Sequence, residues 1–261
     1  MRIECVLCGT VAGKYSRLSH TSEKYSIYKC SDCGLEYTAP IPSDNELIDF
    51  YKKYKDIRAD KVIVEKNVQK NIDLIKKYTS INEQSFVLDF GCGNGEFVRL
   101  YGNNCYGVEL LADKSNEKIK NSIDSFDIKK FDCITLFGVL EHLNNLHLTM
   151  LDIESHLEKN AYLVLSTVDA EGLIPYYYKP PEHLTYWTKK SFEVLAKNLN
   201  LEIIYYNNYT MIQHGNIYLE RLLSRTPENL SKIVLDNVSQ DFPKFVEVPT
   251  NEILVIMQKK G

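Results

Sequence analysis

The sequence predicts an α/β protein whose core is a largely parallel β-sheet with helices on both faces. The first observation is a short apolar run at 86–88, followed by an acidic residue and by Gly91, Gly93 and Gly95 at alternate positions. A buried strand, a glycine-rich turn and a helix N-terminus in this order are typical of the edge at which doubly wound folds bind a ligand. The second observation is that further apolar runs of strand length follow, at 105–110, 131–137 and 162–167.

The glycine-rich segment V-L-D-F-G-C-G-N-G-E-F, residues 87–97, is expected to contact a ligand. Glycine is needed where the backbone turns with positive φ and where a ligand comes close to the main chain. A dinucleotide fingerprint, G-x-G-x-x-G, would need a small residue at position 96, where Glu96 stands. A P-loop would need Lys followed by Ser or Thr after the last glycine, and neither is present. A turn that binds no ligand is the remaining alternative.

The pattern D-x-G-x-G-x-G at 89–95 resembles motif I of the class I S-adenosylmethionine-dependent methyltransferases. The resemblance covers residues 85–200 well. It implies a Rossmann-like sheet of seven strands, with the sixth at 201–206 and an antiparallel seventh at 253–258. It also implies S-adenosylmethionine as the cofactor, S-adenosylhomocysteine as the product, and a position for Asp89 near the ammonium group of the cofactor.

Two strand-end segments downstream extend this resemblance. A carboxylate at the end of the second strand can accept hydrogen bonds from both ribose hydroxyls. The resemblance of this segment to motif II implies that Glu109 is the ribose ligand and that Leu110 packs on adenine. An exposed surface glutamate is the alternative. The segment F-D-x-I…V-L-E-H-L at 131–143 resembles the fourth-strand motif, which lies beside the methionine part of the cofactor. The expected cofactor-binding residues are Asp89, Gly91, Gly93, Asn94, Gly95, Glu109, Leu110, Ile123, Asp124 and Phe137.

Four cysteines near the N-terminus have the spacing of a zinc site. They form two matching half-sites, Cys5-x-x-Cys8-Gly and Cys30-x-x-Cys33-Gly. Four thiolates on two such turns suit tetrahedral Zn²⁺, which predicts a structural zinc ribbon over residues 1–40. A redox Cys-x-x-Cys, which needs only one pair, and four unrelated cysteines are the alternatives. Residues 1–38 are not strongly basic, so the ribbon is interpreted as a scaffold or substrate-side wall rather than an RNA clamp.

The rest of the chain divides into two further parts. Residues 41–80 are predicted to be a helical linker that covers the cofactor site. Its first part resembles a segment of one methyltransferase branch in which a tyrosine-containing stretch lies over the cofactor, and this resemblance implies such a role for Tyr51 or Tyr54; plain packing is the alternative. This linker begins with a capping-box pattern at Ser43 and Glu46. Residues 81–261 form the predicted methyltransferase domain. A helical insertion at about 207–250 is interpreted as a lid or a homodimer surface.

The loop 168–188 is expected to line the acceptor pocket, because ligands of α/β sheets bind beyond the carboxyl ends of the strands. An alcohol acceptor benefits from a base with a pKa near the working pH, and histidine suits this role. His183 and His142 are therefore the candidate catalytic residues, with His183 preferred because it lies in this loop. An amine acceptor needs no such base.

Composition and charge indicate which partners and which cell compartment to expect. The chain of 261 residues has a formal net charge of −4 and a pI near 5.9, which argues against electrostatic binding of nucleic acid over a broad surface. Because no apolar run reaches membrane-spanning length and no signal-peptide pattern is seen, a cytoplasmic protein is expected. The segment C-G-L-E-Y-T-A-P-I-P-S-D-N-E-L-I-D-F-Y at 33–51 resembles the junction between zinc ribbon and helix in a methyltransferase branch often found in sugar and cell-surface biosynthesis. This resemblance implies O- or N-methylation of a small molecule, such as a sugar or nucleotide-linked sugar of surface polysaccharide. The alternatives are an RNA methyltransferase and a non-catalytic cofactor-binding module.

Overall fold

The computed structural model describes residues 3–11, 13–14, 24–53, 60–110, 116–172, 178–224, 226–238 and 241–261. Its centre is a seven-stranded sheet with the order β10-β11-β8-β7-β4-β5-β6. The strands are β4 (Val87–Phe90), β5 (Cys105–Val108), β6 (Ile119–Lys120), β7 (Phe131–Phe137), β8 (Leu157–Val168), β10 (Leu201–His214) and β11 (Phe245–Lys259). All neighbours are parallel except β11, which is antiparallel to both β8 and β10. This confirms the predicted Rossmann-like sheet and its antiparallel last strand.

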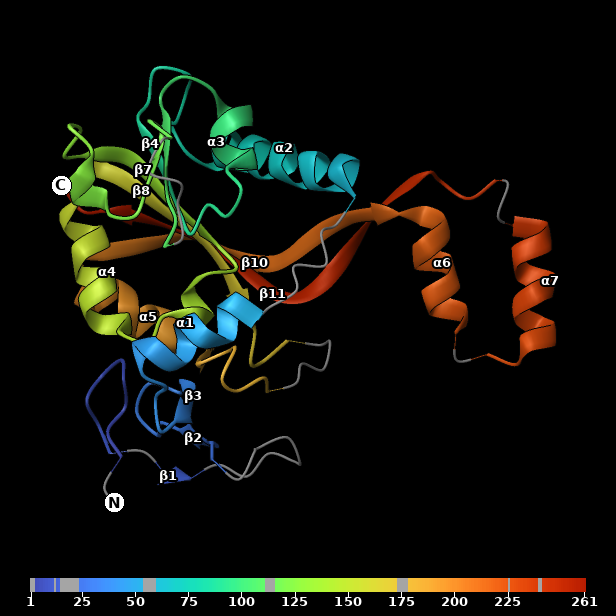
Figure 1. The fold of residues 1–261 in the computed structure, drawn as a ribbon, viewed down its shortest axis with the longest axis horizontal. Helices are drawn as coiled ribbons and strands as arrows, with labels where there is room; N and C mark the ends of the chain where they lie inside the picture. The colour runs from blue at the N-terminus through green and yellow to red at the C-terminus, as the bar shows by residue number, and fades with distance from the viewer. Residues whose placement is uncertain are drawn as a thin grey trace.

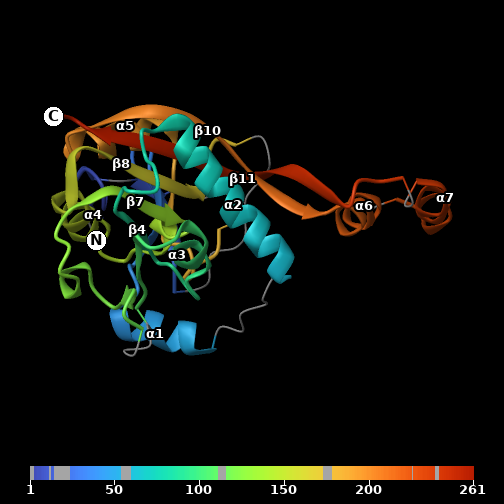
Figure 2. The same cartoon turned by 90° about the horizontal axis from the view of Figure 1, so that it is seen from above.

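Helices cover both faces of the sheet (Figures 1 and 2). On one face lie α2 (Lys61–Tyr78) and α3 (Glu96–Tyr101), whose apolar side chains pack with those of Val87 and Cys133. On the other lie α4 (Leu146–Ser155) and α5 (Lys189–Asn198), which pack on Leu88 and Ile134. Successive side chains of a strand point to opposite faces, so these nearly continuous apolar strands supply both cores. No described helix is long and apolar enough to cross a membrane.

A capping box starts helix α5. The Thr188 side chain accepts a hydrogen bond from the Ser191 backbone, and the Ser191 hydroxyl accepts one from the Thr188 backbone. We expect Thr188→Ala to lower the free energy of unfolding by about 1 kcal/mol, because a buried helix end loses its cap. Urea unfolding measures this change. Thr188→Ser keeps the hydroxyl and should retain most of the stability; an equal loss in both variants would show that the methyl group, not the cap, matters.

A second sheet joins the N-terminal module to the loop 168–188, which the sequence predicts to line the acceptor pocket. It has the order β1-β2-β3-β9, formed by β1 (Gly13–Lys14), β2 (Ser26–Lys29), β3 (Glu36–Ala39) and β9 (Thr185–Tyr186). Strand β9 lies in the loop predicted to line the acceptor pocket and pairs antiparallel with β3. The Thr38 backbone N–H and hydroxyl donate to the carbonyl oxygens of Leu184 and His183, at 2.8 and 2.9 Å. The N-terminal module is therefore hydrogen-bonded to the loop that the sequence predicts to line the acceptor pocket.

An arm projects from the main body (Figures 1 and 2). Strands β10 and β11 run on as a pair as far as His214 and Phe245, and the arm ends in α6 (Gly215–Leu223) and α7 (Glu228–Val238). The prediction of a helical insertion over 207–250 is thus corrected, because its outer parts extend the sheet. Within the described residues α7 buries no side chain, and Leu230 and Ile233 are more than half exposed.

Candidate functional site

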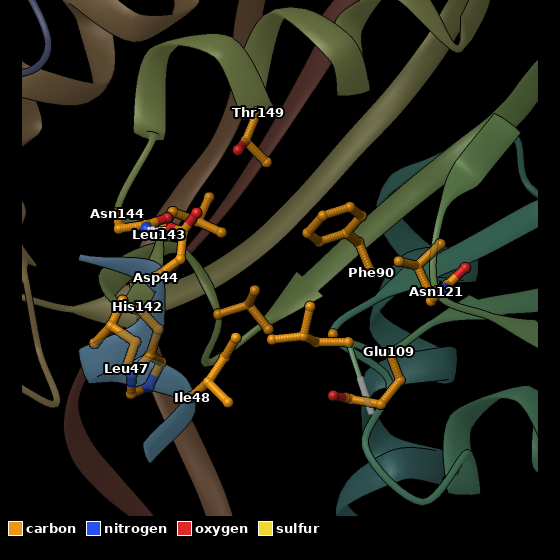
Figure 3. A pocket seen from close by; sticks show the side chains of 14 residues that line it. Asp44, Leu47, Ile48, Phe90, Glu109, Asn121, His142, Leu143, Asn144 and Thr149 are labelled. Carbon is orange, nitrogen blue, oxygen red and sulfur yellow. Dashed lines mark hydrogen bonds between the residues drawn. The ribbon is translucent and has the colours of Figure 1, made fainter. Parts of the chain in front are cut away.

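A cavity of about 450 Å³ opens at the carboxyl ends of β4 and β5. Helix α1 (Asp44–Lys53) lies across from these strand ends, and Figure 3 shows Leu47 and Ile48 facing Phe90 and Glu109 over the cavity. The turn after β7 and the start of α4 complete the wall. The lining residues are Asp44, Leu47, Ile48, Phe90, Gly91, Val108, Glu109, Leu110, Asn121, Val139, His142, Leu143, Asn144 and Thr149.

The glycine loop between β4 and α3 has the backbone that the sequence predicts. Gly91, Gly93 and Gly95 have φ values of 75°, 53° and 81°, in the left-handed region. A Cβ atom at Gly91 would lie 2.4 Å from a methyl group of Val139 in the cavity wall, and one at Gly95 would lie 2.5 Å from Ile119. A Cβ at Gly93 would meet nothing within 4 Å. The loop therefore needs glycine for packing at two positions and leaves open space at the third.

Asp89 does not line the cavity. As the third residue of β4 it points to the same face as Val87, whereas Phe90 points into the cavity. Its carboxyl is buried and accepts a 2.7 Å hydrogen bond from the Thr135 hydroxyl. Burial raises the pKa of Asp89 to about 7. The expected contact with the ammonium group of the cofactor stays a prediction, and the shown partner of the Asp89 carboxyl is Thr135 on the neighbouring strand β7.

The raised pKa of Asp89 predicts how the stability of the fold depends on pH. Because the folded pKa lies above the ordinary value of 3.8, the unfolded chain binds fewer protons, and stability falls as pH rises from about 4 to 7. Asp89→Asn removes the cost of ionising this buried carboxyl, a cost that lowers the free energy of unfolding of the wild type by about 4 kcal/mol above pH 7. We therefore expect the variant to be more stable than the wild type at pH 8, with a smaller gain at pH 5. Urea unfolding at both pH values checks this; a gain independent of pH would contradict it.

Glu109 and Leu110 lie where the sequence predicts, at the end of β5 and in the cavity wall. Figure 3 shows the Glu109 carboxylate pointing across the cavity. One of its oxygens accepts a 2.9 Å hydrogen bond from the Gly93 backbone N–H, so the acid and the glycine loop meet. Leu110 exposes 64% of its surface, which leaves an apolar face available to a flat ring.

Other predicted cofactor residues lie outside this cavity. Ile123 is in the core and Asp124 is exposed, since both belong to a 3-10 helix, η1 (Ile123–Ser125), beyond the two-residue strand β6. Phe137 packs on Phe97, with ring centroids 5.8 Å apart, on the α3 face. Asn94 and Gly95 line a separate surface hollow.

Sequence reasoning missed several lining residues. Asn121, two positions before the predicted cofactor residue Ile123, lines the cavity, whereas Ile123 does not. Asp44 and Asn144 lie at the opposite end, where the Asn144 amide donates a hydrogen bond to the Asp44 carboxylate. The capping-box pattern located the helix that carries Asp44, but gave no sign of this contact. The side chains of Tyr51 and Tyr54 lie outside the described residues.

The two candidate catalytic histidines are neighbours, with ring centroids 5.0 Å apart in an edge-to-face arrangement. His142, in the 3-10 helix η2 (Leu140–His142), lines the cavity, whereas His183 is not one of its lining residues. Burial lowers the pKa of His142, and it lowers that of His183 to about 3. An imidazole with so low a pKa is a weak base at neutral pH. The geometry thus favours His142 over His183 for contact with an acceptor.

The four N-terminal cysteines converge as the spacing predicts. The sulfur atoms of Cys5 and Cys33, and those of Cys8 and Cys30, are 3.5 Å apart, and all four lie within 4.8 Å of one another. These separations are too long for disulfides and close to the roughly 3.8 Å edge of a tetrahedron with zinc–sulfur bonds of 2.3 Å. In both turns the N–H of the following glycine donates to the carbonyl of the first cysteine. The donor set and its shape fit Zn²⁺.

The strand order, the glycine loop and the acid at the next strand end define a class I S-adenosylmethionine-dependent methyltransferase. The chain belongs to the methyltransferase domain family, whose model matches residues 63–206.

Two similar proteins extend the comparison. A ubiquinone biosynthesis O-methyltransferase of Rickettsia bellii is 24% identical, with 71% of this chain and 83% of the relative covered. Among solved structures, the 1,6-didemethyltoxoflavin-N1-methyltransferase of Burkholderia thailandensis, with bound substrate and S-adenosylhomocysteine, has a TM-score of 0.53 at 13% identity. That likeness covers 93% of this chain and 99% of the other and supports the fold.

Proposed function

We propose that this methyltransferase transfers the methyl group of S-adenosylmethionine to a hydroxyl oxygen of a small molecule. The observation that carries the proposal is the cavity between α1 and the strand ends, whose volume falls in the usual range for small-molecule sites. An oxygen acceptor is supported by the O-methyltransferase of Rickettsia bellii. The net charge of −4 argues against RNA as the acceptor.

The two ends of the cavity suit the two substrates. At one end, Glu109 would accept hydrogen bonds from the ribose hydroxyls of the cofactor, while Leu110 packs on its adenine. At the other end, Asp44, Asn144 and Thr149 supply polar groups between apolar walls. A hydroxylated acceptor, such as a sugar or a nucleotide-linked sugar, fits this end. Methyl transfer then depends mainly on alignment of oxygen, methyl carbon and sulfur, which can supply roughly 7–11 kcal/mol.

We also propose that Cys5, Cys8, Cys30 and Cys33 bind a structural Zn²⁺. The support is the four-sulfur cluster and its shape. The ion would hold together a module too small to fold on its own core. Because β3 of this module pairs with β9, the ribbon would act as a wall on the acceptor side rather than as a separate binding domain.

The test of the acceptor class uses methyl-labelled cofactor, the purified protein and an extract of its own cells separated into RNA, protein and small metabolites. We expect label in the small, polar metabolites, and alkaline stability of the product would identify an ether rather than an ester. Label in RNA would overturn the acceptor proposal. Absence of label in every fraction would favour the non-catalytic cofactor-binding module.

Cofactor binding is tested by substitution. We expect Glu109→Ala to weaken S-adenosylhomocysteine binding at least tenfold, because hydrogen bonds to charged groups contribute about 1.5–3 kcal/mol. Asp89→Ala should weaken it severalfold through the glycine loop. Calorimetry measures both, with the exposed Glu158→Ala as the control. Wild-type affinity in both variants would refute this assignment.

A further inference from the structure

Three side chains next to the cavity, Glu141, His142 and His183, form a cluster that could hold a metal ion. One carboxylate oxygen of Glu141 and one ring nitrogen of each histidine lie within 4.8 Å of one another. Two of them come from η2 and the third from the segment just before β9. Two imidazoles and a carboxylate are a ligand set of catalytic zinc and of related divalent cations, and it leaves a coordination position open for water or substrate.

A hydrogen bond of His142 fixes the imidazole in the tautomer whose Nε2 atom can bind a metal ion. Its Nδ1 atom lies 2.7 Å from the backbone oxygen of Glu182, which can only accept, so Nδ1 carries the hydrogen. The lone pair is therefore on Nε2, which lies 3.9 Å from Oε1 of Glu141. A metal-ligating histidine is commonly oriented in this way by a carbonyl on its second nitrogen.

The other two side chains complete the arrangement. The Nδ1 atom of His183 is buried, and it forms no hydrogen bond with any described residue. A buried polar atom without a partner costs about 1–3 kcal/mol, which a bound cation would offset. Glu141 is also buried, and its Oε2 accepts a 2.7 Å hydrogen bond from the Thr167 hydroxyl. This bond fixes the carboxylate with Oε1 on the side of His142.

We propose that Glu141, His142 and His183 bind a divalent transition-metal cation of the zinc type, which coordinates the acceptor hydroxyl. The role of the ion rests on the proposed function, and His142 connects the cluster to the cavity. The coordinated hydroxyl releases its proton to solvent, and an oxygen electron pair forms the bond to the methyl carbon. The carbon–sulfur bond breaks with its electron pair on sulfur, which yields a methyl ether and S-adenosylhomocysteine. The cation is neither oxidised nor reduced, and the two histidines are ligands rather than bases.

Cobalt(II) titration tests the site in full-length protein that has been dialysed against a chelator and shown by metal analysis to retain its ribbon zinc. We expect one further equivalent of cobalt to bind, with d–d absorption but without the charge-transfer band of thiolate ligands. Glu141→Gln keeps the size of the side chain and an oxygen that can accept from Thr167. Loss of a residue that only contacts a metal ligand typically weakens metal binding by roughly 10–100-fold. Because Glu141 is proposed as a direct ligand, Glu141→Gln should weaken cobalt binding by more than this.

His147→Ala, which removes an exposed histidine of α4, is the matched control and should bind cobalt as the wild type does. Calorimetry with S-adenosylhomocysteine shows whether each variant is folded. Absence of a further cobalt site in the wild type, or equal binding by Glu141→Gln, would overturn the metal proposal even if methyl transfer is observed. Cobalt binding without methyl transfer to any fraction would instead overturn the proposed function.

Discussion

Cys33→Ser should abolish binding of the proposed ribbon zinc and lower the rate of methyl transfer by about 100-fold or more, while S-adenosylhomocysteine binding changes little. Cys33 is fully buried, and its sulfur atom lies 3.5 Å from that of Cys5 in the four-sulfur cluster. Structural zinc contributes about 10–16 kcal/mol to the folding of small zinc modules, so loss of one ligand should unfold the ribbon. Metal analysis, steady-state kinetics and calorimetry measure the three effects.

The reason for a catalytic effect is the pairing of the ribbon with the acceptor loop. Strand β3 pairs with β9, and the Tyr178 hydroxyl donates a 2.6 Å hydrogen bond to the Glu36 carboxylate of β3. Without these contacts the segment that carries His183 loses its support, and a displacement of about 1 Å can cost 10²-fold in rate. Cys133→Ala, in the core of β7, is the control that should retain ribbon zinc. Full activity in zinc-free Cys33→Ser would contradict this role.

Gly91→Ala is expected to abolish measurable S-adenosylhomocysteine binding. The added Cβ would lie 2.4 Å from Val139, at a position whose φ of 75° already disfavours a side chain. The cost combines a left-handed backbone, roughly 1–2 kcal/mol, with displacement of either the loop or the cavity wall. Calorimetry measures the affinity, and circular dichroism confirms that the sheet remains folded.

Gly93→Ala provides the matched comparison, because its φ is also positive but its Cβ would meet no atom within 4 Å. This variant carries the backbone cost without the collision, so we expect a smaller loss of affinity than for Gly91→Ala. Equal losses in the two variants would show that backbone strain, and not the contact with Val139, determines the effect.

The features that could be predicted from the sequence are encoded by short spacings. The two Cys-x-x-Cys-Gly turns bring two sulfurs together within four residues, and the structure brings the turns into one cluster. The acid after β5 could be placed because the carboxyl ends of neighbouring parallel strands meet at one edge. Asp89 shows the limit of this reasoning, since its motif position did not reveal that it faces the core and bonds Thr135. Ile123 lies in the core and outside the cavity lining, and its expected contact with the cofactor stays a prediction.

The sequence by itself therefore determined the fold class, the glycine loop, Glu109 and the cysteine cluster, since each depends on local pattern and strand polarity. Three other features could be seen only in the tertiary structure. They are the pairing of β3 with β9, the position of α1 across the cavity and the proximity of Glu141 to His183. The paired strands are more than 140 residues apart in the chain, as the bond from Thr38 to His183 shows. Contacts of this kind depend on how whole elements pack, because no local spacing brings their residues together.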